Sequence, residues 1–326
     1  MGIGCRNLMK NMRNKKLPLV SVVMPVYNAG RYLNESVKSI VKQTYKNWEL
    51  IIVNDASTDN SLDILKQYKR KYPQKIKIIN LLKQLDREGD PATNLAIKLA
   101  KGKYIAKMDA DDTAHPKRLL KQLEYLENNK QIFLVGCSAN VINNKGKIIG
   151  EKIMPSNPLE IYKEYINFHP IIHPSIMFRN KVIKRKDFYM QKYSSSNDYY
   201  TLFSLLCQNH RFANLKEKLL NYRIYGGNVS FKNIKKKFMN TLHIKLEIAQ
   251  KFYYPITMTA VMQTLMQSLA VFLLPEKISF YLYLLTKKIM KPEDILEIIK
   301  TGSSVRFSYL IKYSRPLLLR IMYLFV

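Results

Sequence analysis

The sequence predicts an α/β domain with a doubly wound, mostly parallel sheet, followed by a C-terminal helical extension. Short apolar runs rich in Val and Ile alternate four times with runs whose apolar residues recur at helical spacing. The connections between these runs are short, as they are in the βαβ units of a parallel sheet. Polar clusters follow directly after three of the apolar runs. In sheets of this class, ligands bind at the edge where the carboxyl ends of the strands lie.

Several apolar runs have the composition of buried parallel strands. The first four occupy residues 17–26 (LPLVSVVMPV), 49–53 (ELIIV), 75–81 (KIKIINL) and 104–108 (YIAKM). Another apolar run begins at residues 132–135. The letters NNKG at residues 143–146 predict a hairpin turn before the next apolar residues.

Helical runs fill the intervals between these strands. Residues 33–41 carry apolar side chains at helical spacing after the first strand. Ser57 can cap the helix that follows the second strand. Residues 92–101 predict a third helix that Gly102 stops, and residues 116–126 predict a fourth.

Length and charge limit how the 326-residue chain can be organised. Lys and Arg number 54 against 24 Asp and Glu, which gives a formal net charge of +30 and favours anionic partners. We expect a basic N-terminal arm at residues 1–16, an α/β domain at 17–230 and a basic, apolar helical extension at 231–326. The basic excess is spread along the chain without a nucleic-acid-binding motif, so nucleic acid is not an expected partner. Three scattered cysteines are too few for a disulfide framework and fit a reducing compartment.

An uncharged segment stands out in the extension. Residues 252–275 carry no charged side chain and are long enough to span a bilayer. Pro255 near the start, and polar residues at helical spacing (Gln263, Thr264, Gln267 and Ser268), instead predict an amphipathic helix. Apolar runs flanked by Lys and Arg also occur at residues 278–285 and 316–326. Such helices suit the interface of an anionic membrane. The alternative is that they pack on the preceding domain.

The polar clusters mark a candidate ligand site. Tyr27 and Asn28 follow the first predicted strand, Asn54 and Asp55 the second, and residues 109–112 (DADD) the fourth. The carboxyl ends of parallel strands share one edge of a sheet, so these clusters are expected to converge. No GxGxxG dinucleotide motif and no GK[ST] phosphate loop is present.

The acidic cluster has the chemistry of a cation site. Asp109, Asp111 and Asp112 lie within four residues of one another, and carboxylates without a basic neighbour repel each other unless a cation lies among them. Oxygen ligands suit Mg²⁺ or Mn²⁺, and Mg²⁺ is commonly held by one or two carboxylates together with substrate phosphates. The alternative is a solvated turn in which Asp112 or Thr113 caps the next helix.

An ordered set of motifs resembles the family 2 glycosyltransferases, which have the GT-A fold. The set reads VSVVMPVYN (20–28), IIVNDASTD (51–59), AKMDADD (106–112), HPKRL (115–119), HPSIMFR (173–179), NDYY (197–200) and NYRIY (221–225). The resemblance covers about two thirds of the chain, from residue 17 to about residue 230. It implies a GT-A domain with a Rossmann-like nucleotide-binding sheet, an enzyme of the hexosyltransferase type and a nucleotide-sugar donor.

The resemblance also implies roles on the donor side. Pro25, Val26 and Tyr27 would flank the nucleotide base, and Asp55 would accept a hydrogen bond from the uracil N3–H. Asp111 would bind the divalent metal and the diphosphate, and Asp109 the ribose or the sugar. From the residues alone, the alternatives are a core aromatic residue at the strand end for Tyr27 and a turn-forming residue for Asp55. For Asp55 the functional role is preferred, because Ser57 already offers a cap. Asp112 is interpreted as structural, and Lys107 as a strand residue that points outward.

On the acceptor side, the resemblance makes Asp198 the general base. From sequence alone, this residue is equally consistent with a helix start, where the dipole favours a carboxylate. The resemblance also places His173 at the acceptor pocket. Prolines after His169 and His173 make a shared zinc site at these two residues unlikely to form. Arg179 and Arg223 are predicted either to meet phosphate or to pair with acids of the fold.

Three residues depart from the family pattern. Asn197 stands where the family usually has Glu, Thr93 where it often has Arg, and Tyr225 where many members have His. Tyr can hydrogen-bond phosphate but is a poor ligand for Mg²⁺ or Mn²⁺. The departures therefore concern the geometry of donor binding.

The main functional hypothesis is a metal-dependent inverting glycosyltransferase. It would move a sugar from a nucleotide diphosphate, here UDP, to a hydroxyl of a growing cell-surface glycan such as capsule or lipopolysaccharide. The acceptor would be a glycan or lipid-linked glycan, and the enzyme would lie peripherally at the cytoplasmic face of the plasma membrane. One alternative is transfer to a polyprenyl phosphate. Another is a non-catalytic basic protein that binds membrane or nucleic acid.

Overall fold

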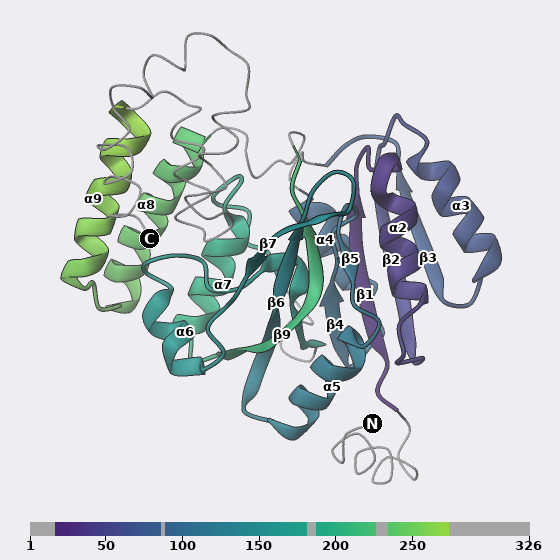
Figure 1. The fold of residues 1–326 in the computed structure, drawn as a ribbon, viewed down its shortest axis with the longest axis horizontal. Coiled ribbons are helices and arrows are strands. Elements are labelled where there is room, and N and C mark those ends of the chain that lie inside the picture. Colours follow the sequence, from purple (N-terminus) through teal and green to yellow (C-terminus); the bar gives the residue numbers. More distant parts are fainter. Residues whose placement is uncertain (1–16, 86–88, 181–186, 226–233, 274–326) are drawn as a thin grey trace. The chain divides into compact units, whose positions relative to one another are not determined.

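The computed structural model describes residues 17–85, 89–180, 187–225 and 234–273 (Figure 1). The predicted basic arm at residues 1–16 and the apolar runs at 278–285 and 316–326 lie outside the described residues. The chain divides into two compact units. The described part of the first comprises residues 17–139, 153–165 and 169–222, and that of the second comprises 140–152, 166–168 and 223–273, apart from the gaps above.

Four parallel strands form one half of the sheet in the first unit. They are β1 (Val20–Val26), β2 (Trp48–Asp55), β3 (Ile76–Leu81) and β4 (Tyr104–Lys107), in the order β3-β2-β1-β4. Strands β1, β2 and β4 are buried along almost their whole length, which explains their continuous apolar sequence. The α/β class and all four predicted strands are confirmed.

Antiparallel strands extend the sheet beyond β4. Strand β8 (Met177–Arg179) pairs with β4 and with β6 (Ile132–Ile142), and β9 (Arg211–Arg223) pairs with the short β5 (Thr113–Ala114). Strand β7 (Ile148–Lys152) pairs with β6 through the predicted hairpin turn, where the Asn143 N–H donates to Lys147 O.

Helices connect the parallel strands as the periodicity predicts. They are α2 (Gly30–Val41), α3 (Ser61–Lys71), α4 (Asp90–Lys98) and α5 (Arg118–Asn128). Helix α2 buries Leu33, Val37 and Ile40, the residues whose spacing predicted it. Helix α4 packs against β1 and β2. The first unit also contains α6 (Pro158–Glu164), a 3-10 turn η1 (His173–Ser175) and α7 (Asn197–Cys207).

Two predicted helix ends were wrong. Ser57 does not cap α3, because that helix begins at Ser61 after Asn60, and the Ser57 hydroxyl is used elsewhere. The helix predicted at residues 92–101 begins earlier and ends at Lys98, so Gly102 does not terminate it. Gly102 is instead packed against β1, where an added Cβ would lie 2.6 Å from the Ser21 backbone nitrogen.

The described part of the second unit contains two helices from the C-terminal extension, α8 (Ile234–Phe252) and α9 (Met258–Leu273). The predicted amphipathic helix corresponds to α9, which packs against α8. Lys245 of α8 donates a hydrogen bond to the Thr264 hydroxyl of α9. None of the helices in the described ranges combines the length and the apolarity that crossing a membrane requires.

Candidate active site

The carboxyl ends of the parallel strands lie at one edge of the sheet. Val26 of β1 is beside Asn54 of β2, which in turn is beside Asn80 of β3. After β4, the Met108 N–H still donates to Val23 O of β1 at 3.0 Å, so the acidic cluster leaves the sheet at the same edge. The three polar clusters therefore converge, as their positions after the strands predicted.

The residues predicted to flank a nucleotide base end strand β1. Val26 is buried and Pro25 half-buried, whereas Tyr27 is 45% exposed. The alternative that Tyr27 is a core aromatic residue is therefore wrong. An exposed ring beside a buried strand end is available for stacking on a planar ligand.

Hydrogen bonds join the loop after β1 to the loop after β2. Asn28 has a positive φ of 47°, its N–H donates to Ser57 Oγ at 3.0 Å, and its Oδ1 accepts from the Thr58 N–H at 2.8 Å. The Gly30 N–H donates to Asp59 Oδ2 at 2.8 Å. Burial tends to raise the pKa of Asp59, but its hydrogen bonds lower the pKa below its usual value overall. We call these two joined loops, residues 28–30 and 57–61, the donor rim.

Asp55 is buried at the end of β2 and shapes the same edge. Its Oδ1 accepts a hydrogen bond from the Leu85 N–H at 2.7 Å, which holds the segment that follows β3. This hydrogen bond gives Asp55 a structural role, in which its carboxylate holds a neighbouring loop. The contact of Asp55 with a uracil stays a prediction.

The interpretation of Lys107 was wrong. Its side chain is 4% exposed and points inward, where its ammonium group forms an ion pair with Asp109 Oδ1. The argument that the acidic cluster has no basic neighbour is therefore also wrong. An ammonium group already neutralises one of the three carboxylates, so repulsion among them no longer requires a metal ion.

A second cation lies behind the acidic loop. The guanidinium of Arg118, in α5, is fully buried and donates to Lys107 O at 2.7 Å and to Gln122 Oε1 at 3.1 Å. Burial lowers its pKa, whereas Asp112 and Asp109 raise it. The sequence analysis assigned Arg118 no role, and its place in the HPKRL motif was the only available signal.

The acidic loop is compatible with a metal ion whose remaining ligands are supplied by the substrate. Asp112 is buried, Asp111 is half-buried, and neither Asp112 nor Thr113 caps α5, whose first turn follows Lys117. No group of three or more His, Cys, Asp or Glu side chains suited to a metal ion occurs in the part of the chain that the structure describes. Mg²⁺ needs only one or two carboxylates when phosphates supply further ligands.

Asp198 lies in the first turn of α7, with two imidazoles facing its carboxylate. Asp198 Oδ2 is 3.7 Å from Nδ1 of His173 and 3.9 Å from Nδ1 of His169, and the Asp198 side chain is 29% exposed. The helix start was predicted and is present. Although the prolines were expected to keep the two histidines off a shared helix face, both side chains lie near the same carboxylate.

The neighbour of Asp198 has a structural role. Asn197 is buried, and its Oδ1 accepts from the backbone N–H groups of Lys192 and Tyr193 at 3.1 and 2.8 Å. The amide that replaces the usual family carboxylate thus shapes the turn before α7. Thr93 is also buried, and its hydroxyl donates to Gly89 O at 2.7 Å.

A buried tyrosine contacts His173. The Tyr189 hydroxyl lies 2.6 Å from Nε2 of His173. Burial raises the pKa of Tyr189 well above its usual value, and Asp90, Asp198 and Asp109 raise it further. Carboxylates from three separate segments therefore act on one phenol. Sequence reasoning missed Tyr189, which lies in an irregular segment without a periodic signal.

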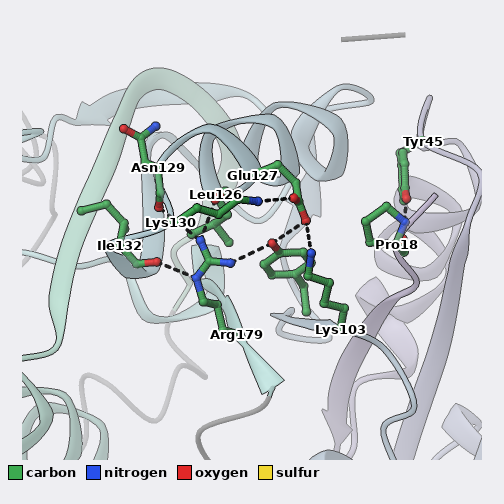
Figure 2. Close-up of polar contacts among 10 residues, drawn as sticks. Pro18, Tyr45, Lys103, Leu126, Glu127, Asn129, Lys130, Ile132 and Arg179 are labelled. Carbon is green, nitrogen blue, oxygen red and sulfur yellow. Dashed lines mark hydrogen bonds and ion pairs between the residues drawn. The ribbon is translucent and has the colours of Figure 1, made fainter. Parts of the chain in front are cut away.

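Arg179 and Arg223 have structural roles. Arg179 donates to Ile132 O, to the Tyr104 hydroxyl, and to Leu126 O and Asn129 O at the end of α5 (Figure 2). Arg223 is buried and donates to Asn143 O at 3.2 Å. For Arg179, the partners are backbone carbonyls and a hydroxyl, so neither predicted alternative, phosphate or an acid, describes its contacts.

Comparisons with known proteins identify the family of this chain and several of its relatives. Residues 21–186 match the family described as "Glycosyl transferase family 2". The chain is 39% identical over 224 residues to an uncharacterized glycosyltransferase of Methanocaldococcus jannaschii, covering 68% of this chain and 76% of that protein. It is 36% identical over 215 residues to the O-antigen biosynthesis glycosyltransferase WbnJ of Escherichia coli, covering 64% of this chain and 81% of the relative.

Solved structures resemble the fold at low sequence identity. TarS of S. aureus in complex with UDP-GlcNAc superposes with a TM-score of 0.56 at 20% identity, over 93% of this chain and 86% of that one. The mannosyltransferase PcManGT of Pyrobaculum calidifontis, in complex with GDP-Man and Mn²⁺, gives a TM-score of 0.56 at 15% identity, over 94% and 81%. The fold is GT-A, as the motifs implied.

The family match and the relatives also decide between the functional classes. They make the protein a transferase enzyme, so the non-catalytic alternative is overturned. Family membership rests on a match to half of the chain and on a relative that shares more than a third of the aligned residues. The chain belongs to family 2 of the glycosyltransferases.

Proposed function

We propose that the protein is a metal-dependent, inverting glycosyltransferase that moves a sugar from a UDP-sugar to a hydroxyl of a growing cell-surface glycan. The observation that carries the proposal is the placement of Asp198. Its partly exposed carboxylate lies 3.7 Å from Nδ1 of His173, whose Nε2 is 2.6 Å from the buried Tyr189 hydroxyl, and both Asp198 and Asp109 raise the pKa of that phenol. A candidate base and the acidic donor-side loop therefore lie around one centre, although they are far apart in the sequence.

This arrangement supplies the groups that an inverting transfer needs. The acceptor hydroxyl gives its proton to Asp198 while its oxygen forms the new bond to the anomeric carbon. The bond from that carbon to the diphosphate breaks on the opposite face, and its electron pair leaves with the nucleoside diphosphate. In-line displacement of this kind inverts the anomeric centre.

Asp111 is the residue that would hold Mg²⁺ or Mn²⁺. Asp112 is buried, whereas Asp111 is half-buried, so the Asp111 carboxylate is the more accessible of the two to an ion that arrives with the substrate. When bound, the ion would neutralise charge on the departing diphosphate. The Mn²⁺ in the complex of the Pyrobaculum mannosyltransferase supports this assignment by similarity of fold.

The donor and the acceptor are inferred from the relatives and from residues beside the donor rim. The UDP-GlcNAc complex of TarS supports a UDP-sugar, and the O-antigen role of WbnJ supports a surface glycan as the acceptor. The exposed Tyr27 beside the buried Asp55 offers a stacking surface and a carboxylate for a uracil base. Transfer to a polyprenyl phosphate is the alternative acceptor chemistry.

The first experiment measures nucleotide release from a panel of UDP-, GDP- and dTDP-sugars, with and without Mn²⁺. We expect Mn²⁺-dependent release from a UDP-sugar, and an Asp198→Asn variant should lose at least about 100-fold in rate, as for a lost general base. Asp187→Asn is the matched control, because Asp187 is an exposed carboxylate paired with Lys98. An Asp198→Asn variant that kept native turnover would refute the assignment. Added glycan and polyprenyl phosphate acceptors separate the two acceptor classes.

We further propose that α9 contacts an anionic membrane, which would place the enzyme peripherally at the cytoplasmic face of the plasma membrane. Large apolar side chains of this helix are exposed at helical spacing: Met258, Val261, Met262, Leu265, Leu269, Phe272 and Leu273. The buried positions of the same helix are small, Ala260 and Ala270. The helix is thus amphipathic with its apolar face outward, which suits lipid. A net charge of +30 favours anionic lipid.

Sedimentation with vesicles tests the membrane proposal. We expect the whole protein to bind phosphatidylglycerol vesicles more strongly than phosphatidylcholine vesicles. Leu265→Glu should weaken this binding, whereas Gln263→Glu adds the same charge to the same helix outside the exposed apolar stripe and should weaken it less. Equal effects of the two substitutions would indicate that charge alone attracts the protein, and would refute a role for the apolar face.

A further inference from the structure

The contact between Tyr189 and His173 determines where the histidine carries its proton. The Tyr189 side chain is fully buried, and its hydroxyl lies 2.6 Å from Nε2 of His173, with the two rings at 84° to each other. The backbone of Tyr189 is held in place by the buried Asn94. Asn94 Nδ2 donates to Tyr189 O, and Asn94 Oδ1 accepts from the Tyr189 N–H, both at 2.9 Å.

A proton count assigns the roles in this hydrogen bond. Burial, with Asp90, Asp198 and Asp109, raises the pKa of Tyr189, so the phenol keeps its hydrogen at neutral pH. Within the described ranges, Nε2 of His173 is the hydrogen-bond partner of that hydroxyl. A buried hydroxyl hydrogen needs an acceptor, so Tyr189 donates and Nε2 accepts.

The imidazole of His173 is neutral. Burial lowers its pKa well below the usual value, and the positive charge of Lys107 and the nearby His169 lower it further. A neutral imidazole carries one N–H. Because Nε2 uses its lone pair to accept from Tyr189, the hydrogen lies on Nδ1, which is 3.7 Å from Asp198 Oδ2.

We propose that Tyr189 is a positioning residue that fixes the Nδ1–H tautomer of His173, so that this N–H orients the Asp198 carboxylate toward the acceptor hydroxyl. This inference rests on the proposed role of Asp198 as the base. The opposite tautomer would direct a nitrogen lone pair at a carboxylate, which is unfavourable. A separation of 3.7 Å is longer than a hydrogen bond, and contacts of this kind tighten when substrate binds.

Nitrogen NMR tests the tautomer without any need for turnover. The full-length protein, labelled with ¹⁵N-histidine, should show the His173 ring with a protonated Nδ1 and an unprotonated Nε2 at neutral pH. A Tyr189→Phe variant keeps the ring volume and removes the donor, so it should show the other tautomer or a mixture. Tyr68→Phe is the control, because it removes a tyrosine hydroxyl that is hydrogen-bonded to Asn34 at the surface. A protonated Nε2 in the native protein, or no change in Tyr189→Phe, would overturn the inference.

Kinetics test whether the tautomer matters to Asp198. We expect Tyr189→Phe to lower kcat about three- to tenfold, the effect of one neutral hydrogen bond, with little change in KM for the donor. In His173→Asn, the side-chain amide can donate near the position of Nδ1 whether or not Tyr189 is present. Adding Tyr189→Phe to His173→Asn should therefore cost nothing further. An equal loss in both backgrounds would mean that Tyr189 acts through packing and would overturn the inference.

The two proposals fail in different ways. If Asp198→Asn keeps native turnover, the assignment of the base is refuted, while the NMR spectrum still reports the tautomer. If Asp198→Asn is inactive and the tautomer does not depend on Tyr189, the base assignment stands and the positioning role of Tyr189 is refuted.

Discussion

Replacement of Arg179 separates a structural role from a phosphate-binding role. The guanidinium of Arg179 makes four hydrogen bonds (Figure 2), to the Tyr104 hydroxyl and to three backbone carbonyls. Two of these carbonyls, of Leu126 and Asn129, belong to the C-terminal end of α5, where a helix leaves carbonyls without internal partners and favours a cation. Arg179→Gln removes the charge and most of the donors.

The size of the effect follows from these contacts. A hydrogen bond from a charged group contributes roughly 1.5–3 kcal/mol, but four bonds of one group are not additive and the site is partly exposed. We therefore expect a loss of about 3 kcal/mol in the free energy of unfolding. For a domain of this size, about 2–4 °C per kcal/mol gives a decrease in Tm of about 6–12 °C.

Thermal melting by circular dichroism and UDP binding by calorimetry provide the assay. We expect Arg179→Gln to lower Tm while UDP affinity is unchanged, and Arg179→Lys, which keeps the charge and one donor, to fall between the variant and the native protein. A melting temperature within about 2 °C of native, together with weakened UDP binding, would show that Arg179 serves the ligand and would refute this reasoning.

Three further results are expected. Gly102→Ala should lower stability by roughly 1–3 kcal/mol in chemical denaturation, because its Cβ would lie 2.6 Å from the Ser21 backbone nitrogen. Burial would raise the pKa of Glu127, but hydrogen bonds from Lys103, Lys130 and Tyr104 lower it from 4.5 to about 2. The contribution of the ionised Glu127 carboxylate to folding stability is therefore complete above pH 4.5 and is lost as the pH falls toward 2. The difference in Tm between the native protein and Glu127→Gln should narrow over that range. Chelation with EDTA should abolish nucleotide release and Mn²⁺ should restore it, with Asp111→Asn needing more Mn²⁺ than native.

The parallel half of the fold was predictable because its strands are buried on both faces. Such strands read as continuous apolar runs, and the run at residues 104–108 became β4, Tyr104–Lys107. The edge at which ligands bind also follows from the strand ends alone. The antiparallel strand β8 has only three residues, and that is too short for a period to be read from sequence.

The charges within the site could not be predicted, since they depend on contacts between distant segments. Lys107 was interpreted as a strand residue that points outward. Lysine is seldom buried without a partner, and the partner here is Asp109, two residues further on and beyond the end of the strand. His169, His173 and Tyr189 come from segments without periodic patterns. Their arrangement around Asp198 depends on the tertiary fold.

The donor rim has a consequence for the thermodynamics of ligand binding. Its two loops hold each other through hydrogen bonds to the side chains of Asn28, Ser57 and Asp59. Their backbone entropy is therefore lost when the chain folds, and a nucleotide that arrives at this edge does not have to order them. Free and nucleotide-bound forms should superpose closely here.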